Sequence, residues 1–112
     1  MKRITAIIRP NRLDAVKNSL VEAGVVGITV SELRSYGLQR VSQKKYRGQE
    51  VLEEFFPRVK VEVIVDESQS ALAIDKLVEA AQTGALGDGK LYVASTENAV
   101  RIRTGEAGSE AI

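Results

Sequence analysis

Three glycines and a lysine are concentrated in the stretch Thr83-Gly84-Ala85-Leu86-Gly87-Asp88-Gly89-Lys90. Because glycine has no Cβ, its backbone N–H groups can face a bulky anion at close range and its φ can be positive. A lysine ammonium adds a point charge that suits a phosphate oxygen. The stretch also matches GxxxxGK, but a P-loop follows a strand, opens a helix and has Ser or Thr after the lysine. Here a helical pattern precedes the stretch, an extended pattern follows it, and residue 91 is Leu. These residues predict either an anion-binding loop of another architecture or a turn that joins a helix to a strand.

A second basic cluster is Arg101-Ile102-Arg103, whose two arginines would share one face of an extended segment. Forked guanidinium groups suit a polyphosphate, and each charge-assisted hydrogen bond contributes about 1.5–3 kcal/mol. Together with Lys90, the gross interaction approaches the ~8 kcal/mol of a micromolar ligand. The alternative is that these arginines pair with surface carboxylates such as Glu97 or Glu106, which contributes little. The spacing alone leaves both interpretations open.

The composition excludes several functional classes. The chain has 112 residues, enough for one domain, and its 16 basic and 15 acidic residues give a formal net charge of +1. A general binder of nucleic acid or acidic membranes would be strongly basic. The sequence contains no Cys and no His, which excludes thiol nucleophiles, disulfides, imidazole bases and the usual zinc sites. The apolar run at the N-terminus is too short for a signal peptide or a membrane span, so we expect a cytoplasmic protein without direct membrane insertion.

Hydrophobic periodicity predicts six regular elements joined by one long irregular segment. Asn11 is the expected N-cap of the first helix, Gly24 its C-terminal stop, and Asp66–Gln69 a turn before the second helix. The basic residues and tyrosines of the irregular segment would suit RNA, but neighbouring glutamates balance them and favour a solvated arm. We expect strands at 2–8, 27–33, 58–65 and 90–94, helices at 12–23 and 71–82, an irregular segment at 34–54, a short extended piece at 99–103 and a loose tail at 104–112.

This order of strands and helices predicts an α+β fold, the ferredoxin-like βαββαβ sandwich, with two helices on one face of an antiparallel sheet. The other face of the predicted sheet also carries apolar residues. We therefore expect self-association into a small symmetric oligomer to cover it.

The two basic clusters, taken together, resemble the PII signal-transduction family. The resemblance rests on Thr83-Gly84-(x)2-Gly87-Asp88-Gly89-Lys90, on Arg101-Ile102-Arg103-Thr104-Gly105-Glu106 and on Tyr46-Arg47-Gly48-Gln49-Glu50. It is collinear over essentially the whole chain. PII proteins are ferredoxin-like homotrimers that bind ATP or ADP in the clefts between subunits and contact target proteins through a long T-loop. The resemblance implies one domain, 1–112, with a T-loop at about 36–54, a nucleotide-binding glycine loop at 83–90 and a C-terminal arginine segment at 99–106.

The resemblance also implies roles for individual residues at a nucleotide site. The phosphates would lie in a cradle formed by Gly87, Asp88, Gly89 and Lys90. Arg101 and Arg103 would reach the same nucleotide, mostly across the subunit boundary. Thr29 and the backbone of Ile64 stand where the family holds the adenine.

The base of the implied T-loop carries the residues expected to sense effectors. Gly37, Leu38 and Gln39 would lie beside the phosphates, and Gln39 would join ATP and 2-oxoglutarate in coordinating Mg²⁺. An amide oxygen is a suitable hard ligand for that ion. Arg58 stands where the family has the lysine that meets the distal carboxylate of 2-oxoglutarate, and it keeps the positive charge with a different geometry.

Several positions depart from the family pattern. Val51 occupies the place of the tyrosine that many members nucleotidylate, so that modification is chemically excluded, and Gln49 lacks the hydroxyl that some members phosphorylate. Ser35 and Val41 stand where the family has glycines near the loop base, and Arg40 stands where it has a lysine. These replacements would disfavour the curled loop that closes over 2-oxoglutarate.

The sequence therefore predicts a regulator and not an enzyme, in which ATP or ADP, with Mg²⁺ and 2-oxoglutarate as further ligands, controls the T-loop and through it target proteins of nitrogen metabolism. The target would be a transporter, a regulatory enzyme or a kinase. An alternative is a divergent relative that senses nucleotides for another transport or metabolic system without 2-oxoglutarate. Slow ATP hydrolysis is a third hypothesis, for which only Asp88 or a loop glutamate could orient water.

Overall fold

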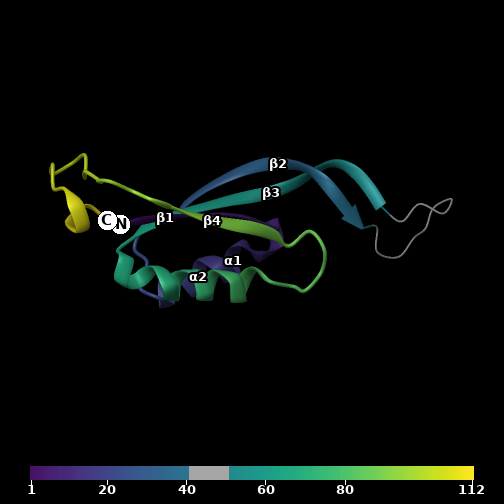
Figure 1. The fold of residues 1–112 in the computed structure, drawn as a ribbon, viewed down its shortest axis with the longest axis horizontal. Helices are drawn as coiled ribbons and strands as arrows, with labels where there is room; N and C mark the ends of the chain where they lie inside the picture. The colour runs from purple at the N-terminus through teal and green to yellow at the C-terminus, as the bar shows by residue number, and fades with distance from the viewer. Residues whose placement is uncertain (41–50) are drawn as a thin grey trace.

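The computed structural model describes residues 1–40 and 51–112, and it describes the side chains of residues 1–37 and 55–112. Four strands form one antiparallel sheet in the order β2-β3-β1-β4, and two helices cover one of its faces (Figure 1). The predicted ferredoxin-like βαββαβ order is confirmed. The elements are β1 (Lys2–Ile8), η1 (Pro10–Arg12), α1 (Leu13–Glu22), β2 (Thr29–Arg40), β3 (Val51–Val65), α2 (Glu67–Ala81), β4 (Gly89–Ser95) and η2 (Gly108–Ala111), where η marks a 3₁₀ helix.

The hydrophobic core lies between the sheet and the two helices. Side chains alternate across a strand, and the register pairs Ile4 with Val63 and Ala6 with Val61, so that apolar residues of neighbouring strands meet on the helix face. The helices contribute apolar residues spaced three or four apart, which places them on one side of each helix. The largest of the fully buried side chains are Ile4, Ile8, Val16, Leu20, Val61, Val63, Val65 and Leu77.

The opposite face of the sheet is covered by neither helix. The register places Thr5 of β1 between Glu62 of β3 and Tyr92 of β4 on this face. Thr5 is nonetheless buried, and its Oγ1 donates a hydrogen bond to Glu62 Oε1 at 3.3 Å. Tyr92 is exposed. The expectation that a second copy covers this face stays a prediction.

The second and third strands of the chain, β2 and β3, are longer than the sequence predicted. β2 and β3 pair continuously from Thr29 opposite Glu62 to Arg40 opposite Val51, so residues 34–40 and 51–54 of the segment predicted to be irregular lie in paired strands (Figure 1). No apolar alternation marks this stretch because the ladder is made by backbone groups and does not need a buried face. The predicted T-loop bounds of 36 and 54 therefore lie within strands. The signature at 46–50 lies outside the described residues.

Two helix boundaries differ from the prediction. Asn11 does not cap α1: Pro10–Arg12 form a 3₁₀ turn, and Arg12 directly precedes the helix. α2 begins at Glu67, before the first apolar residue of its periodic pattern, and Asp66 in the N-cap position makes no side-chain cap. Gly24 has a φ of 90°, as its predicted role as a helix stop requires.

The C-terminal arginine segment is folded as a turn and not as a strand. Val100 and Ala107 form a single antiparallel bridge, and within it Arg101 N donates to Glu106 O at 2.8 Å and Gly105 N donates to Arg101 O at 2.7 Å. The prediction of an extended piece at 99–103 is wrong. The prediction that Arg101 and Arg103 share one face of an extended segment is therefore wrong as well. The tail is not loose either, because 108–111 form η2.

Candidate functional site

The carboxylate of Asp88 organises the glycine loop from within. Its Oδ2 accepts hydrogen bonds from the backbone N–H groups of Thr83 at 2.8 Å and Gly84 at 2.9 Å. Its Oδ1 accepts from the Thr83 hydroxyl and from Nε of Arg9 at 3.0 Å. The Thr83 hydroxyl and N–H, and then Arg9 and Gly84, hold the pKa of Asp88 well below its ordinary value, although partial burial opposes them. The carboxylate is thus committed to the loop, and only the backbone of Asp88 is left for the predicted phosphate cradle.

Sequence reasoning missed the partners of Asp88. Arg9 lies at the end of β1, 79 residues away along the chain, and its Nη2 also donates to the carbonyl oxygen of Leu86 at 2.6 Å. No local pattern marks such a long-range contact. Thr83 belongs to the motif of the glycine loop. Its hydroxyl, five residues before Asp88, is the one local feature of the sequence that indicates this turn.

The glycine at position 89 is required by the sheet. Gly89 pairs with Ile8 at the start of β4 and has a φ of 103°. A Cβ added there would lie 1.8 Å from the carbonyl oxygen of Ile7, closer than any real Cβ contact. Gly87 also has a positive φ, of 96°. These two backbone conformations turn the chain sharply into β4, where Lys90 is exposed beside them.

A hollow of about 430 Å³ lies between the glycine loop and the base of the β2–β3 hairpin. Gly37 lines it together with Gly87, Gly89 and Lys90 of the glycine loop. Leu38 and Gln39 continue β2 through backbone pairing with Glu53 and Leu52, and their side chains lie outside the described residues. The lining residues are Ile7, Ser35, Tyr36, Gly37, Phe56, Arg58, Gly87, Gly89 and Lys90.

Arg58 joins the two sides of this hollow. Its Nη2 donates to the carbonyl oxygen of Gly87 at 3.2 Å, its Nη1 donates to the carbonyl oxygen of Pro57 at 2.7 Å, and its guanidinium carbon lies 5.7 Å from the ring centre of Phe56. Burial, and then the nearby charge of Arg9, lower the pKa of Arg58 from its ordinary value. Arginine remains charged after such a shift, so the hollow keeps a positive wall.

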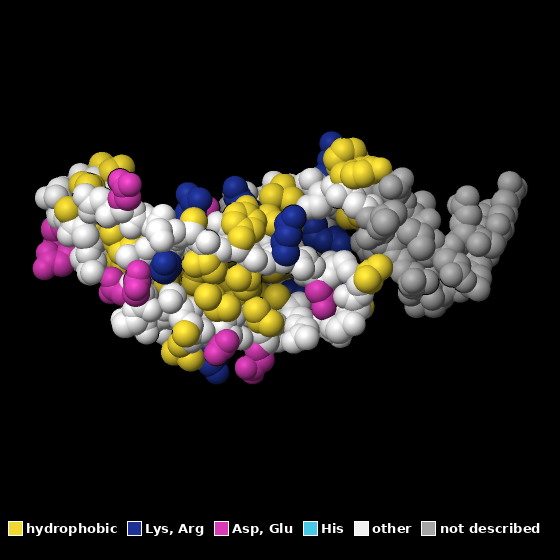
Figure 2. Space-filling model, viewed as in Figure 1, with side chains coloured by type: hydrophobic (Ala, Val, Ile, Leu, Met, Phe, Trp, Pro, Cys, Tyr) yellow, Lys and Arg dark blue, Asp and Glu magenta, His cyan; other side chains and the backbone are white. Residues whose placement is uncertain are grey.

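The electrostatic character of this hollow suits an anion. Figure 2 shows Lys and Arg side chains gathered beside the base of the hairpin, next to the residues drawn in grey. The charge of Arg9 is compensated by Asp88, whereas Lys90 is exposed and free to face a ligand. Backbone N–H groups in left-handed conformations beside a lysine fit the phosphates of a nucleotide. Among the described residues, no group of three or more acidic side chains could hold a metal ion on its own.

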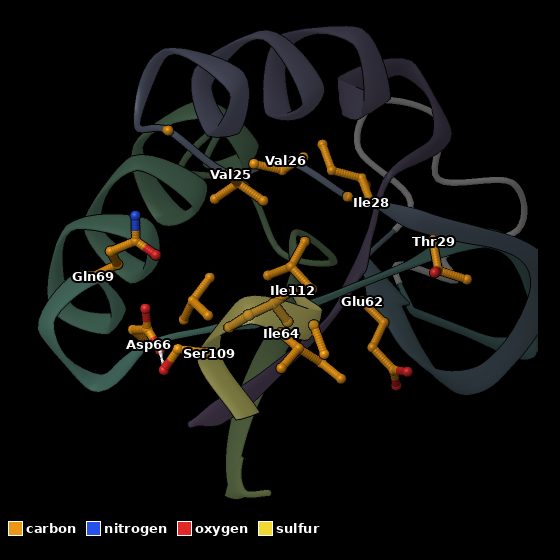
Figure 3. Close-up of a pocket in the computed structure, with 15 residues that line it drawn as sticks. Val25, Val26, Ile28, Thr29, Glu62, Ile64, Asp66, Gln69, Ser109 and Ile112 are labelled. Atoms are coloured by element: carbon orange, nitrogen blue, oxygen red, sulfur yellow. Dashed lines mark hydrogen bonds between the residues drawn. The ribbon is translucent and has the colours of Figure 1, made fainter. Parts of the chain in front are cut away.

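The residues predicted to hold adenine lie in a different hollow. Thr29 and Ile64 line a cavity of about 560 Å³ at the other end of β3, together with Glu62 and the C-terminal segment (Figure 3). Ile112 points into this cavity near Ile64. The Ser109 hydroxyl donates to Asp66 Oδ1 at 2.7 Å and anchors the segment there.

The predicted phosphate-binding arginines also lie away from the glycine loop. Lys90 stands near the first residue of β4, and Arg101 follows the end of that strand, where the C-terminal segment begins (Figure 1). At about 3.3 Å per residue, the five steps from Lys90 to Ser95 alone span ~17 Å. Arg101 Nη1 lies 3.4 Å from Glu106 Oε1, so the alternative pairing of Arg101 with a surface carboxylate is present in the structure. Within one chain, the predicted site residues therefore fall into two groups that lie apart. The first group lines the hollow at the glycine loop and consists of Gly37, Gly87, Gly89 and Lys90. The second group lies away from it and consists of Thr29, Ile64, Arg101 and Arg103.

This combination of features defines a ferredoxin-like regulatory domain with an anion-receptive loop at the base of a projecting hairpin. Comparisons with known proteins make the class specific. Residues 1–106 match the family described as "Nitrogen regulatory protein P-II". Proteins with that name from a Synechocystis species and from Nostoc punctiforme are 52% and 49% identical over 112 residues, covering all of both chains.

Two solved structures share the fold over nearly the whole chain. The structure of Bacillus subtilis GlnK has a TM-score of 0.82 and 31% identity, covering 99% of this chain and 97% of its own. The structure of Arabidopsis thaliana PII bound to citrate has a TM-score of 0.82 and 33% identity, covering 99% and 91%.

The chain belongs to the P-II nitrogen-regulatory family. It is accordingly a nitrogen-regulatory signal transducer and not an enzyme. The family binds nucleotides and effectors and acts by binding target proteins. None of the described helices is long and apolar enough to cross a membrane.

Proposed function

We propose that this chain senses adenine nucleotides as a homotrimer, with each ATP or ADP held in a cleft between two subunits. One observation carries the proposal: Lys90 and the arginines Arg101 and Arg103 lie at opposite ends of β4 in a single chain. No single phosphate chain reaches across that distance. The glycine loop of one subunit and the arginine segment of a neighbour would supply the two halves, and Thr29 and Ile64 would come with the arginine half.

The arginine half is ready to accept a phosphate. The Arg101–Glu106 pair is about two-fifths exposed on both sides, and such surface pairs contribute ~0–1 kcal/mol. A charge-assisted hydrogen bond to a phosphate contributes about 1.5–3 kcal/mol, so exchange of Glu106 for a phosphate is favourable. Arg103 lies within the turn and is exposed.

The glycine half is tied to the hairpin, which supports a route from ligand to target. Gly37 and Lys90 line one hollow, and Arg58 bridges β3 to Gly87. A ligand that moves the glycine loop therefore changes the base of the hairpin, and the hairpin carries the segment that would contact a target protein. Gln39 would supply an amide oxygen as a ligand to Mg²⁺ bound with the nucleotide. The targets would be a transporter, a regulatory enzyme or a kinase of nitrogen metabolism in the cytoplasm.

A carboxylate effector fits the same hollow. The guanidinium of Arg58 is half-buried there, and a forked cation binds a carboxylate bidentately. The related Arabidopsis protein was solved with citrate, a carboxylate, bound. We propose 2-oxoglutarate as the effector, with Gln39 and Arg58 as its contacts.

Subunit mixing tests the proposal directly. Lys90→Ala and Arg103→Ala should each weaken ATP binding by about 1.5–3 kcal/mol in isothermal titration and leave the trimer intact in sedimentation. In a trimer assembled from both variants, one cleft combines the intact Lys90 of one subunit with the intact Arg103 of its neighbour. Mixed and refolded subunits should therefore regain a fraction of tight sites. If neither variant weakens ATP, or if mixing restores nothing, the cleft between subunits is the wrong site.

A further inference from the structure

Arg9 holds the outer turn of the glycine loop through two contacts of different kinds. Its Nε donates to Asp88 Oδ1 at 3.0 Å, and its Nη2 donates to the carbonyl oxygen of Leu86 at 2.6 Å. Both side chains of the ion pair are about four-fifths buried, at 20% and 22% exposure. A pair of this kind is screened less by water than a surface pair, so its geometry is well defined.

Asp88 in turn fixes the first turn of the same loop. The backbone N–H groups of Thr83 and Gly84 both donate hydrogen bonds to its Oδ2. The loop is thereby held at two points: Asp88 binds its start, and Arg9 binds its middle through the carbonyl oxygen of Leu86. The residues that follow, Gly87 and Gly89, have left-handed backbones with no side chain to stabilise them.

The carboxylate would repel a polyphosphate if it were not compensated. Asp88 lies between Gly87 and Gly89, which line the hollow that Lys90 and Arg58 make positive. Like charges near a protein surface repel each other strongly at short range. The guanidinium of Arg9, whose Nε lies 3.0 Å from Asp88 Oδ1, compensates this charge.

We propose that Arg9 and Asp88 are a positioning pair, which holds the glycine loop in its anion-binding conformation and screens the Asp88 charge from a bound polyphosphate while neither side chain touches the ligand. This inference rests on the proposed nucleotide function. It assigns to the loop two determinants of phosphate affinity that are distinct from Lys90 and the C-terminal arginines.

The test compares ATP, which carries three phosphates, with adenosine, which carries none. Arg9→Met, Asp88→Asn, the double variant and Arg9→Lys are titrated with ATP by calorimetry and with adenosine by NMR. Arg12→Met is the matched control, because Arg12 also donates two hydrogen bonds to one backbone carbonyl, that of Ala80, outside the loop. We expect Arg9→Met and Asp88→Asn to bind ATP about tenfold more weakly, because both lose the loop conformation, and in Asp88→Asn this loss outweighs the removal of the repelling charge. Adenosine binding should be unchanged, and Arg12→Met should equal wild type.

The double variant and hydrogen exchange separate positioning from a general loss of stability. The double variant should bind ATP no more weakly than the worse single variant, because one pair is lost in each case. The amides of Thr83 and Gly84 should exchange faster in Asp88→Asn and not in Lys90→Ala. Arg9→Lys keeps the charge but cannot reach both acceptors, so it should lose less ATP affinity than Arg9→Met. It replaces Arg9→Met in the test if that variant does not fold.

The outcomes distinguish this inference from the proposed function. If Lys90→Ala weakens ATP binding while Arg9→Met and Asp88→Asn bind it as wild type, the positioning pair is overturned and the nucleotide site stands. Equal losses for ATP and adenosine, or strictly additive losses in the double variant, would also overturn it. If the wild-type protein binds no ATP, the proposed function fails, and this inference with it.

Discussion

The Nη2 atom of Arg58 donates a hydrogen bond to the carbonyl oxygen of Gly87 at 3.2 Å, although the two residues are 29 positions apart in the chain. Arg58 belongs to β3, close to the base of the hairpin, and Gly87 belongs to the loop that leads into β4. The contact therefore connects the glycine loop, which would bind a phosphate, with the β2–β3 hairpin, which would contact a target protein. A carboxylate that engages Arg58 competes with Gly87 for the same guanidinium.

Arg58 should consequently control the response to 2-oxoglutarate more than the affinity for ATP. We expect Arg58→Met to abolish the heat of 2-oxoglutarate binding to protein loaded with ATP and Mg²⁺, because the cation that meets the carboxylate is gone. Arg58→Lys should bind it measurably, since a lysine keeps the charge without the fork. ATP affinity should change by less than about 1 kcal/mol, because the contact with the glycine loop that is lost is the hydrogen bond to the neutral backbone carbonyl of Gly87.

The wild-type protein provides the decisive control for this prediction. If millimolar 2-oxoglutarate gives no heat with the ATP-loaded wild type, then the protein senses nucleotides alone. That outcome would favour the divergent relative suggested by Ser35, Arg40 and Val41.

Gly89 should be the glycine of the loop that least tolerates a side chain. Gly89→Ala places a Cβ 1.8 Å from Ile7 O at a φ of 103°, so β1 and β4 must separate at the point where they pair. We expect a loss of about 3 kcal/mol or more in the free energy of unfolding, measured by urea denaturation. Gly84→Ala is the matched control: its φ is 87°, but nothing lies within 4 Å of the added Cβ. It should cost about 1 kcal/mol, the penalty for a left-handed alanine. Equal losses for the two variants would show that the contact with Ile7 is relieved without cost.

Lowering the pH should reduce the stability of the folded protein through protonation of Asp88. Its pKa is lower in the folded state than in the unfolded chain, so the folded state favours the ionised form. The stabilisation is fully present above the unfolded value of about 3.9, and it is lost as the pH falls from there towards the depressed folded pKa. Urea midpoints at constant ionic strength should fall below about pH 4, and Asp88→Asn should flatten that part of the profile. A profile identical to wild type would mean that Asp88 is not the group responsible.

The sequence was informative wherever local rules determine the structure. Periodicity located β1, both helices and the buried half of β3, because those segments have one apolar face. It did not locate the outer half of the hairpin. There, Tyr36 and Phe55 pair across the strands with ring centres 5.3 Å apart, both are exposed, and neither belongs to an alternating pattern.

The site was predictable in its residue types but not in its internal contacts. Gly37, which the family resemblance implies to lie beside the phosphates, lines one hollow with Gly87, Gly89 and Lys90. The partners Arg9 with Asp88 and Arg58 with Gly87 are contacts of high sequence separation, which no window of sequence can reveal. The turn at Arg101 depends on Gly105, whose φ is 76°, and on a bridge to Ala107 that the alternation of two arginines does not indicate.

The C-terminal segment should contribute to stability even though the sequence predicts a loose tail. Ser109 anchors it to Asp66 beside the start of α2, and Ile112 fills part of the cavity that Thr29 and Ile64 line. Deleting 108–112 should lower the free energy of unfolding by about 2 kcal/mol, the sum of a modest hydrogen bond and partial burial of an isoleucine. Ser109→Ala removes the hydrogen bond alone and should cost about 1 kcal/mol or less. Both are compared with wild type by urea denaturation at one protein concentration, because oligomer stability depends on it. Unchanged midpoints after the deletion would mean that the segment rests on the surface without stabilising it.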